Sequence, residues 1–586
     1  MNKVKSTVNI VAKFFARAPI YSIVHIVSTF FFASKVYILA FFNKKLINLL
    51  VEIIQSKNIN YLVNIVLIIC MVFGVELLFS LCSHVSKYFI NKYSMKYHDD
   101  MNVEFYKKMS SVDISSYDSS TQRDKMTQAH KDMNSIEAAF RNFVSILVSF
   151  CSIIISIVII FQLDFLLALA IFLSLVPTFF ARKKVQERQY DLEKKLNKTN
   201  RKINYFGGLF WNGGVAPEMR LYNYSDFFLD KIKELYAHRN NKNLNLNKKN
   251  SILELICLLI SGLINICYNV YIIILVIMKG LSVGDYNYYS TISGNFKGSI
   301  DIILVNVSTF MVNIKKAENY FEFMNMKNEV VSGTNEVPAM KTIEFVNVSF
   351  SYPDSNTLVL RNLNFSFNSG EKVALAGLNG AGKSTIIKLL FRLYDPTSGV
   401  ILYNGIDIKS FDVNAYRRQF AAMLQDSPNF KISIRENVAL SNIDNIQSDE
   451  KILKILSSVG LNYNDYDLDN QIGKDFDPEG VIMSKGQSQS LRLSKLFYKN
   501  CSFWIFDEPA SNLDATVEKQ IFENIFENCT DLQTIILISH RLSNLKFVDK
   551  IIFLQDGRVI ESGSHKELFD CRGEYYRLYK IQSERY

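Results

Sequence analysis

Long apolar runs constrain the fold of this 586-residue chain more than any other feature. A membrane-spanning helix needs about 20 predominantly apolar residues. Six candidate runs lie before about residue 315: 20–42, 61–82, 143–162, 164–181, 252–278 and 285–312. The rest of the chain has the composition of an ordinary soluble protein. The sequence therefore predicts a multi-pass α-helical membrane domain followed by a soluble domain.

Basic residues follow the apolar pattern and explain the net charge of +10. Lys and Arg concentrate around 83–142 and 182–250, whereas short connections such as 162–164 and 278–280 carry few. This asymmetry is typical of membrane proteins whose basic segments face the cytoplasm. We therefore expect both termini in the cytoplasm and no nucleic-acid partner.

The first apolar run follows Lys3, Lys5, Lys13 and Arg17 and lacks a small-residue cleavage site, which favours an uncleaved first span over a signal peptide. The eight cysteines form no CxxC pair or Cys/His cluster, so we expect neither disulfides nor a metal site on them.

Two polar segments between spans are too long for structureless loops, so we expect helices that extend below the membrane. Their tips would fall near Ser115-Ser116-Tyr117-Asp118 and Gly207-Gly208-Leu209-Phe210. The expected domains are a transmembrane domain (1–325), a linker (326–340) and a soluble domain (341–586).

A glycine-rich loop in the soluble domain fits the P-loop pattern G-x-x-x-x-G-K-[ST] between an apolar strand and a helix. Such a loop points backbone N–H groups at phosphate oxygens, and the helix N-terminus adds its dipole. Lys383 should reach the β- and γ-phosphates, and Ser384 should ligate Mg²⁺. The predicted phosphate-binding residues are Gly377, Asn379, Gly380, Gly382, Lys383, Ser384 and Thr385. This motif predicts an α/β P-loop ATPase domain.

Other residues complete the expected ATP site. The apolar strand 502–506 ends in Asp507, placed to hold Mg²⁺, and Glu508, placed to act as general base on water. A second buried strand, 535–539, is expected to bring His540 to its end, where the imidazole can contact the γ-phosphate. Gln425 ends a third strand and can touch Mg²⁺ or water, and Tyr352 can stack on adenine.

Met483-Ser484-Lys485-Gly486-Gln487, before a helix expected to begin near Ser488, resembles the LSGGQ signature of ATP-binding-cassette (ABC) proteins. Nearly the whole chain resembles an ABC exporter half-transporter. The resemblance implies two chains that sandwich two ATPs head to tail. Ser484, Gly486, Gln487 and Asp514 would then act in trans, and the two helix tips would be coupling helices.

Lys485 departs from the family pattern, because a glycine usually stands there. Its side chain would either crowd the phosphate or add a favourable cation. Degenerate signatures also occur in heterodimeric relatives, so both a homodimer, which we favour, and a heterodimer with a related chain stay open.

The resemblance implies alternating access driven by ATP. Polar residues at membrane depth are tolerated where they face a protein interior or a wet cavity. The sixth span is rich in them, and Lys297 and Asp301 share one helical face. The candidate cavity residues are Lys35, Glu76, Asn295, Lys297 and Asp301, for which mutual pairing between helices is the alternative.

Ile472-Gly473-Lys474-Asp475-Phe476 resembles a Gly-Lys-x-Phe segment of bacterial lantibiotic-type exporters, and the Asn/Lys/Ile/Tyr-rich composition suits a bacterial source. No room for a peptidase domain precedes the first span. We therefore expect a bacterial plasma-membrane exporter of a ribosomally made, modified peptide. The alternatives are a multidrug or lipid exporter and, from another class, an ATP-gated regulator without cargo. An importer is disfavoured because importers usually carry these domains on separate chains.

Overall fold

The computed structural model divides the chain into two compact units. One comprises Met1–Ser110 and Lys125–Met326, and the other comprises Ser111–Asp124 and Lys327–Tyr586. The residues that it describes are 2–56, 62–353, 355, 357–425, 427–461, 467–499, 501–509, 518, 521–523, 525–526, 529–530, 533–539 and 541–583.

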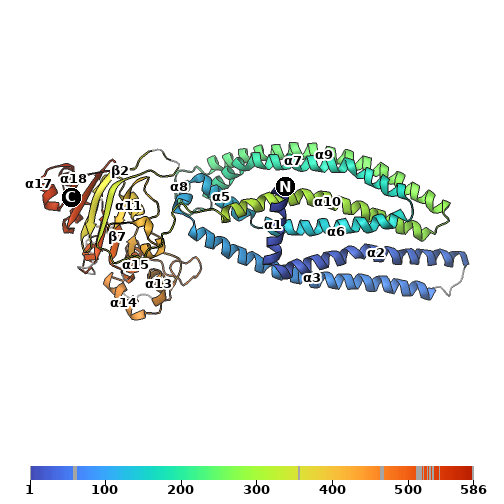
Figure 1. The fold of residues 1–586 in the computed structure, drawn as a ribbon, viewed down its shortest axis with the longest axis horizontal. Coiled ribbons are helices and arrows are strands. Elements are labelled where there is room, and N and C mark those ends of the chain that lie inside the picture. Colours follow the sequence, from blue (N-terminus) through green and yellow to red (C-terminus); the bar gives the residue numbers. More distant parts are fainter. Residues whose placement is uncertain are drawn as a thin grey trace. The chain divides into compact units, whose positions relative to one another are not determined.

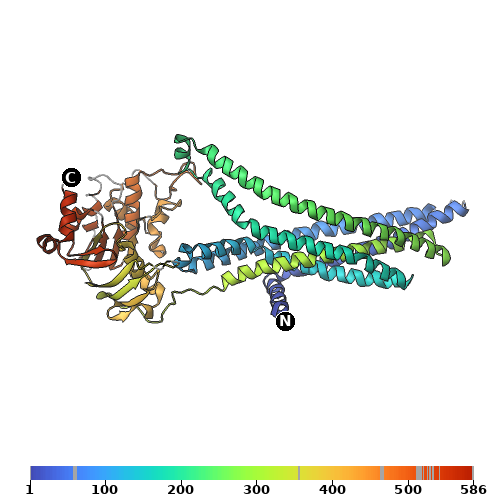
Figure 2. The ribbon, with the colours of Figure 1, turned by 90° about the horizontal axis from the view of Figure 1, so that it is seen from above.

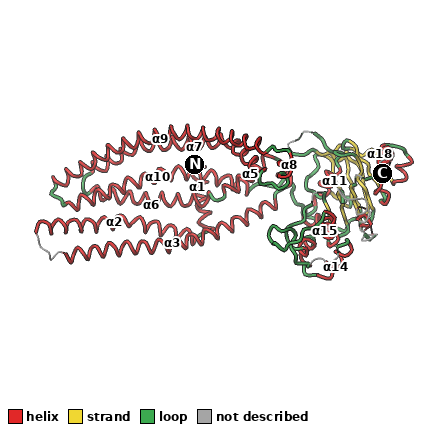
Figure 3. The backbone as a smooth tube through the Cα atoms, turned by 180° about the vertical axis from the view of Figure 1, so that it is seen from behind, coloured by secondary structure: helices red, strands yellow, loops and turns green. Residues whose placement is uncertain are grey.

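The first unit is built from long helices, coloured red in Figure 3 (see also Figure 1). Each apolar run forms part of a helix that continues into polar sequence. The helices are α1 (Asn2–Arg17), α2 (Pro19–Ser56), α3 (Leu62–Ser111), α5 (Ser120–Asp132), α6 (Ser135–Phe161), α7 (Phe165–Leu209), α8 (Ala216–Leu221), α9 (Ser225–Met278) and α10 (Val283–Met324).

Several of these helices are far longer than a bilayer requires. Helices α3, α7, α9 and α10 have 50, 45, 54 and 42 residues, against the roughly 20 that cross the hydrocarbon core. Helix α7 lies beside α9, and α10 packs along α6 (Figures 1 and 2). The expected helical extensions beyond the apolar runs are therefore present.

Five of the described helices are long and apolar enough to cross a membrane: α2, α3, α6, α9 and α10. They contain five of the six predicted spans. The remaining predicted span, 164–181, falls at the start of α7, and the side chains of 165–179 lie outside the described residues. That span stays a prediction.

A buried carboxylate ties three helices together in this unit. Glu137, in the first turn of α6, is 3% exposed. Its oxygens accept hydrogen bonds from Tyr21 Oη (2.8 Å) of α2 and Ser94 Oγ (3.1 Å) of α3, and pair with His98 Nε2 (2.7 Å) of α3. Arg141 Nη1 lies 3.6 Å away. A buried charge persists only when it is compensated in this way.

The second unit contains two sheets. The six-stranded sheet has the order β10-β9-β3-β8-β7-β6 and is parallel except for the edge strand β10. Its strands are β3 (Lys372–Gly377), β6 (Phe420–Met423), β7 (Phe503–Asp507), β8 (Thr534–Ile538), β9 (Lys550–Gln555) and β10 (Arg558–Gly563). Strands β7 and β8 are buried throughout, as a parallel sheet covered on both faces requires.

The smaller sheet is antiparallel, with the order β2-β1-β4-β5. Its strands are β1 (Thr342–Phe350), β2 (Leu360–Asn368), β4 (Ser398–Tyr403) and β5 (Ile406–Asp407). One apolar core joins both sheets to α11. The helices of this unit are α4 (Ile114–Asp118), α11 (Lys383–Leu390), α12 (Val413–Arg418), α13 (Ile434–Ala439), α14 (Asp449–Ser458), α15 (Lys485–Tyr498), α17 (His565–Asp570) and α18 (Glu574–Ser583).

Residues 327–341, which we call the strap, lie along the second unit. The backbone N–H groups of Gly333 and Thr334 donate to the carbonyl oxygens of Phe411 (2.9 Å) and Ser410 (3.1 Å). A Cβ on Gly333 would lie 2.1 Å from the Ser410 oxygen, so this close backbone approach requires glycine. The segment expected as a linker is thus hydrogen-bonded to the folded unit.

Candidate functional site

The parallel strands bring most of the predicted site residues to one edge of the large sheet. The P-loop follows β3, Gln425 follows β6 closely, and Asp507 ends β7. Strands β3, β8, β7 and β6 are neighbours in the sheet and run in the same direction. Their carboxyl ends therefore meet at one edge, where ligands of such sheets bind.

The P-loop backbone has a shape that only glycine accommodates. Gly377, Gly380 and Gly382 have φ angles of +142°, +81° and +100°. A Cβ on Gly377 would lie 2.2 Å from the carbonyl oxygen of Leu554, and one on Gly382 would lie 2.5 Å from Leu360 Cδ2. The glycine spacing seen in the sequence therefore has a direct steric cause.

Lys383 is the first residue of α11, and its side chain contacts the backbone of the P-loop. Its ammonium donates to the carbonyl oxygens of Gly377 (2.8 Å) and Leu378 (3.0 Å). The side chain is 6% exposed, and this burial lowers the pKa of the lysine, although the nearby Glu508 and Asp507 act in the opposite direction. The arrangement holds a cation at the N-terminus of a helix, where the dipole also attracts anions.

The remaining P-loop residues face different surroundings. Asn379 and Ser384 are exposed, whereas Thr385 is buried and its hydroxyl lies 3.0 Å from the Tyr352 hydroxyl. The Tyr352 ring is half-buried, with the Lys388 ammonium 5.1 Å from its centroid. The structure thus places the predicted adenine contact beside the first turn of α11.

Two predicted catalytic residues are in contact. Gln425 Nε2 donates to a carboxylate oxygen of Glu508 at 3.0 Å. Glu508 has a φ of +53°, and its N–H donates to the carbonyl oxygen of Ile538 on the neighbouring strand (3.0 Å). Non-glycine residues seldom adopt such a φ, and positions held this way cluster at functional sites.

The oxygen donors at this edge suit Mg²⁺, which prefers carboxylate, hydroxyl and amide oxygens. Asp507 is 5% exposed at the end of β7, the Ser384 hydroxyl is exposed in the first turn of α11, and Gln425 is exposed. No cluster of three or more His, Cys, Asp or Glu residues forms a metal site among the described residues. The donor set therefore fits an ion held jointly with a nucleotide rather than a metal held by protein alone.

Two predicted site residues, His540 and Asp514, lie outside the described residues. Their roles stay predictions. The neighbouring Ser539 is described, and its hydroxyl accepts a hydrogen bond from the Arg541 N–H at 3.1 Å.

The signature residues form the start of α15, which begins at Lys485 rather than near Ser488 as expected. Ser484 caps the helix, because its hydroxyl accepts from the Gln487 N–H (3.2 Å). The Gln487 side-chain oxygen accepts from the Ser484 N–H (2.9 Å). This capping box satisfies two N-terminal donors and starts the helix three residues early. Ser484 and Lys485 are exposed, and a Cβ on Gly486 would meet no atom closer than 4.0 Å.

The predicted cavity residues in the helical unit have mixed surroundings. Asn295 Nδ2 donates to Tyr37 Oη (2.9 Å), which in turn donates to the Ser152 carbonyl oxygen (2.7 Å). Asn295 therefore takes part in a hydrogen-bond network between α10, α2 and α6. Such pairing between helices is the alternative that we gave to contact with cargo. Of the others, Glu76 is exposed, and Lys35, Lys297 and Asp301 are half-buried.

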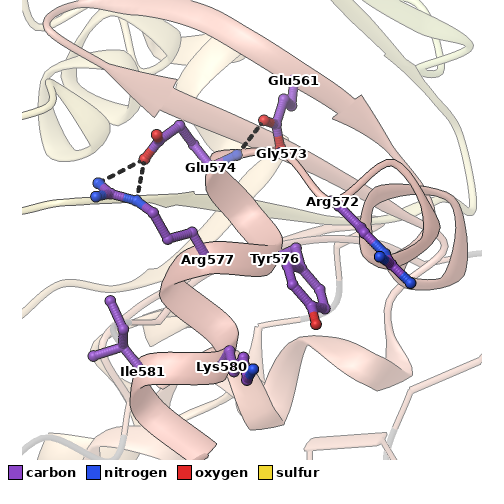
Figure 4. Close-up of a pocket in the computed structure, with 8 residues that line it drawn as sticks. All are labelled: Glu561, Arg572, Gly573, Glu574, Tyr576, Arg577, Lys580 and Ile581. Atoms are coloured by element: carbon purple, nitrogen blue, oxygen red, sulfur yellow. Dashed lines mark hydrogen bonds and ion pairs between the residues drawn. The ribbon is translucent and has the colours of Figure 1, made fainter.

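A hollow lies at the C-terminal end of the second unit, apart from these residues in the fold. It is lined by Glu561, Arg572, Gly573, Glu574, Tyr576, Arg577, Lys580 and Ile581 (Figure 4). Arg577 and Glu574 form an ion pair there (2.8 Å between Nη2 and a carboxylate oxygen), and the Glu561 carboxylate accepts from the Glu574 N–H (2.6 Å). These lining residues leave the hollow without the phosphate-binding features described above.

Sequence reasoning named Asp118 only as part of an expected helix tip, and it missed the Asp118 partner Tyr394 and the role of Asp113, which directly precedes α4. The Tyr394 hydroxyl donates to the Asp118 carboxylate, and the Asp113 carboxylate accepts from the Val330 N–H (3.2 Å). No local pattern reveals these contacts, because the two partners of each hydrogen bond lie 276 and 217 residues apart in the sequence.

Comparison with known families identifies the class of protein. The family description "ABC transporter" matches residues 360–511, and "ABC transporter transmembrane region" matches residues 25–300. A helical membrane domain joined to a P-loop ATPase domain defines the class as an ATP-hydrolysing membrane transporter. The chain belongs to the ABC transporters, and its domain composition is that of an exporter half-transporter.

Two relatives match about nine-tenths of the chain, and a third matches about half of it. It is 29% identical to the subtilin transport ATP-binding protein of Bacillus subtilis, with 93% of this chain and 89% of that protein covered. The nisin transport ATP-binding protein of Lactococcus lactis is also 29% identical, with 90% and 88% covered. The ATP-dependent lipid A-core flippase of Coxiella burnetii is 33% identical over 288 residues, 48% of this chain and 47% of that protein.

A solved structure of a bacterial Atm1-family ABC exporter with ATP bound has the same fold. The TM-score is 0.81 at 19% identity, with 96% of this chain and 99% of that chain covered. The predicted fold class, family and ATP hydrolysis are confirmed.

Proposed function

We propose that this ABC exporter moves a ribosomally synthesised, modified peptide of the lantibiotic kind out of a bacterial cell. The observation that carries the proposal is the match over about nine-tenths of the chain to two proteins named for subtilin and nisin transport. The flippase match covers only about half of the chain. Its existence makes lipid export the second candidate.

The ATP chemistry is assigned to residues at the sheet edge. Lys383 and the P-loop N–H groups bind the phosphates, and Tyr352 contacts adenine. Glu508 takes a proton from the attacking water, and Gln425, hydrogen-bonded to Glu508, orients that water. Asp507, Ser384 and Gln425 would hold Mg²⁺, which would supply positive charge against the phosphate oxygens. His540 contacts the γ-phosphate.

We assign the signature to the ATP of a second copy of this chain. Ser484 and Lys485 are exposed at the N-terminus of α15, which is available for a phosphate. Gly486, Gln487 and Asp514 complete that surface in the homodimer. Closure of two ATPase domains on ATP, and reopening after hydrolysis, would drive the alternating access of the membrane helices.

The cargo path is assigned to the polar face of α10. Lys297 and Asp301 are half-buried, one helical turn apart. Lys35 and Glu76 are the further candidates on α2 and α3. A path of this polarity suits a charged or amphipathic peptide better than a lipid tail, because buried charges need polar partners.

ATP hydrolysis and peptide transport, measured together in proteoliposomes, test this proposal. Inside-out vesicles containing the protein receive ATP and a fluorescent lanthionine-containing precursor peptide. We expect uptake that depends on ATP, and we expect Glu508→Gln to lower hydrolysis at least about a hundredfold while ATP still binds. Glu450→Gln, which changes an exposed carboxylate on α14, should behave like the parent protein.

The outcomes separate the candidate functions. Peptide uptake equal to that of an ATP-free control would refute peptide export. ATP-dependent movement of a labelled lipid in the same vesicles would then favour the lipid exporter. Hydrolysis without movement of either molecule would favour a regulator without cargo.

A further inference from the structure

Helix α4 belongs to the second unit, which we call the ATPase unit, and contacts within this unit hold both of its ends. The segment Ser111–Asp124, which includes α4, belongs to the same compact unit as Lys327–Tyr586. The same segment is covalently continuous with the long helix α3 before it and α5 after it. Any movement of α4 within the ATPase unit must therefore act on those two helices directly.

Tyr394 holds the C-terminal end of α4. Its hydroxyl donates a hydrogen bond to the Asp118 carboxylate, and its side chain is 4% exposed. Burial, and then the neighbouring Asp118, raise the pKa of Tyr394 above its ordinary value. The phenol therefore stays protonated and remains a donor throughout the physiological pH range.

The same tyrosine contacts the proposed adenine-binding ring. The Tyr394 and Tyr352 rings meet edge to face, with centroids 5.5 Å apart and an interplanar angle of 87°. The Lys388 ammonium lies 5.1 Å from the Tyr352 centroid and 6.0 Å from the Tyr394 centroid, and it confines both rings. Because the Tyr352 hydroxyl bonds Thr385 of the P-loop helix, a continuous chain of contacts runs from α11 to α4.

Asp113 holds the other end of α4 against the strap. Its carboxylate accepts hydrogen bonds from the N–H groups of Glu329 and Val330, the latter at 3.2 Å. Asn328 Nδ2 donates to the Ser111 carbonyl oxygen (2.5 Å). The Arg392 guanidinium, 2% exposed, donates to the Val331 carbonyl oxygen (2.7 Å) and so fixes this part of the strap from inside the unit.

We propose that Tyr394 is a positioning residue that transmits the binding of adenine at Tyr352 to α4 through Asp118, while Asp113 and the strap form the fixed end. A base stacked on Tyr352 restricts that ring, the restricted ring fixes Tyr394, and Tyr394 fixes the Asp118 end of α4. The inference rests on the proposed function, because it takes Tyr352 as the adenine contact. It requires only that ATP favours one arrangement of these contacts over another.

Hydrogen exchange on the full-length protein in nanodiscs tests the inference. In the Glu508→Gln protein, ATP should slow amide exchange both in the P-loop (377–385) and in segment 111–124. Adding Tyr394→Phe should leave P-loop protection in place and reduce the ATP-dependent protection of 111–124 about fivefold, as for one lost hydrogen bond. Tyr416→Phe is the matched control, because that buried hydroxyl donates to the Leu390 carbonyl oxygen (3.0 Å) and not to α4.

Each outcome has a distinct meaning. Full ATP-dependent protection of 111–124 in Tyr394→Phe would overturn the inference while leaving ATP binding intact. Absence of P-loop protection in the Glu508→Gln protein itself would refute the proposed function, and the inference with it. If Tyr394→Phe lowers the melting temperature more than Tyr416→Phe does, the exchange measurement is repeated with Asp118→Asn. That variant keeps the packing of the Tyr394 ring and weakens only the acceptor of the Tyr394 hydrogen bond. Unchanged protection in Asp118→Asn would also overturn the inference.

Discussion

At the scale of single residues, backbone conformation and burial give the site its chemistry. Gly377 takes a φ of +142° against the Leu554 carbonyl, and Glu508 takes a φ of +53° beside Gln425. Lys383 is buried against two carbonyl oxygens. These features cost folding stability, as strained residues at functional sites commonly do, and they preorganise the proposed phosphate site.

The lowered pKa of Lys383 predicts how ATP affinity depends on pH. Phosphate oxygens stabilise the ammonium, so the pKa of Lys383 is higher with ATP bound than without it. Binding then takes up a proton once the pH exceeds the lowered pKa of the free site. ATP affinity should be greatest below that pKa and should fall as the pH rises towards the ordinary value of 10.5.

Calorimetry of ATP binding at alkaline pH, in two buffers with different ionisation enthalpies, measures this proton uptake. Lys383→Arg is the control, because a guanidinium stays charged throughout the range. The ATP affinity of the Lys383→Arg protein, even if it is weaker at every pH, should not fall as the pH becomes alkaline. An identical decline in both proteins would show that another group titrates.

The sequence could predict the residues that act through spacing along one loop. The P-loop glycines and Lys383 follow each other directly, so a pattern reveals them. The contact of Tyr352 with Tyr394, and of Tyr394 with Asp118, joins positions up to 276 residues apart. No local pattern encodes such a contact, because it depends on how distant elements pack.

At the scale of elements, the same residues serve two purposes at the start of α15. Ser484 and Gln487 form a capping box that builds the helix, and they also belong to the proposed phosphate-binding signature. Recognition of the S-x-x-Q pattern as a cap would have placed the helix start correctly. In α10, by contrast, the sequence pattern could not show that Asn295 bonds Tyr37, since both cavity and packing use polar residues.

Substitution of Lys485, the first residue of α15, should change helix stability and ATPase activity in opposite directions. Lys485 places a positive charge at the positive end of the helix dipole, so Lys485→Glu should stabilise the helix by about 0.3–1 kcal/mol. The same change puts a carboxylate where the proposal puts a phosphate, so ATPase activity should fall at least about tenfold.

Melting temperature and ATPase rate, measured on the same preparations, check both effects. Lys485→Gln removes the charge without reversing it and should lie between the parent and Lys485→Glu in activity. Parent-like hydrolysis by Lys485→Glu would contradict the assignment of this helix start to a phosphate.

At the scale of the whole molecule, composition predicted the order of a helical membrane part and an α/β ATPase part. Hydropathy suffices for that, because the bilayer demands long apolar helices. It could not predict that residues 327–341 pack along the second unit, since their hydrogen-bond partners, such as Asp113 and Arg392, lie far away in the sequence. It also left open whether the proposed in-trans ATP site uses a second copy of this chain or a related chain.

Complementation between two defective chains tests whether a second copy completes that site. Lys383→Ala disables the P-loop and Gly486→Asp disables the signature, so each homodimer should be inactive alone. In a head-to-tail dimer of one chain of each kind, one site combines both defects and the other site is intact. Co-expression with two different affinity tags, followed by purification through both, should yield about half of the parent ATPase activity if the two sites work independently. A doubly purified dimer no more active than either single variant would contradict the in-trans site, because sites built within one chain cannot complement each other.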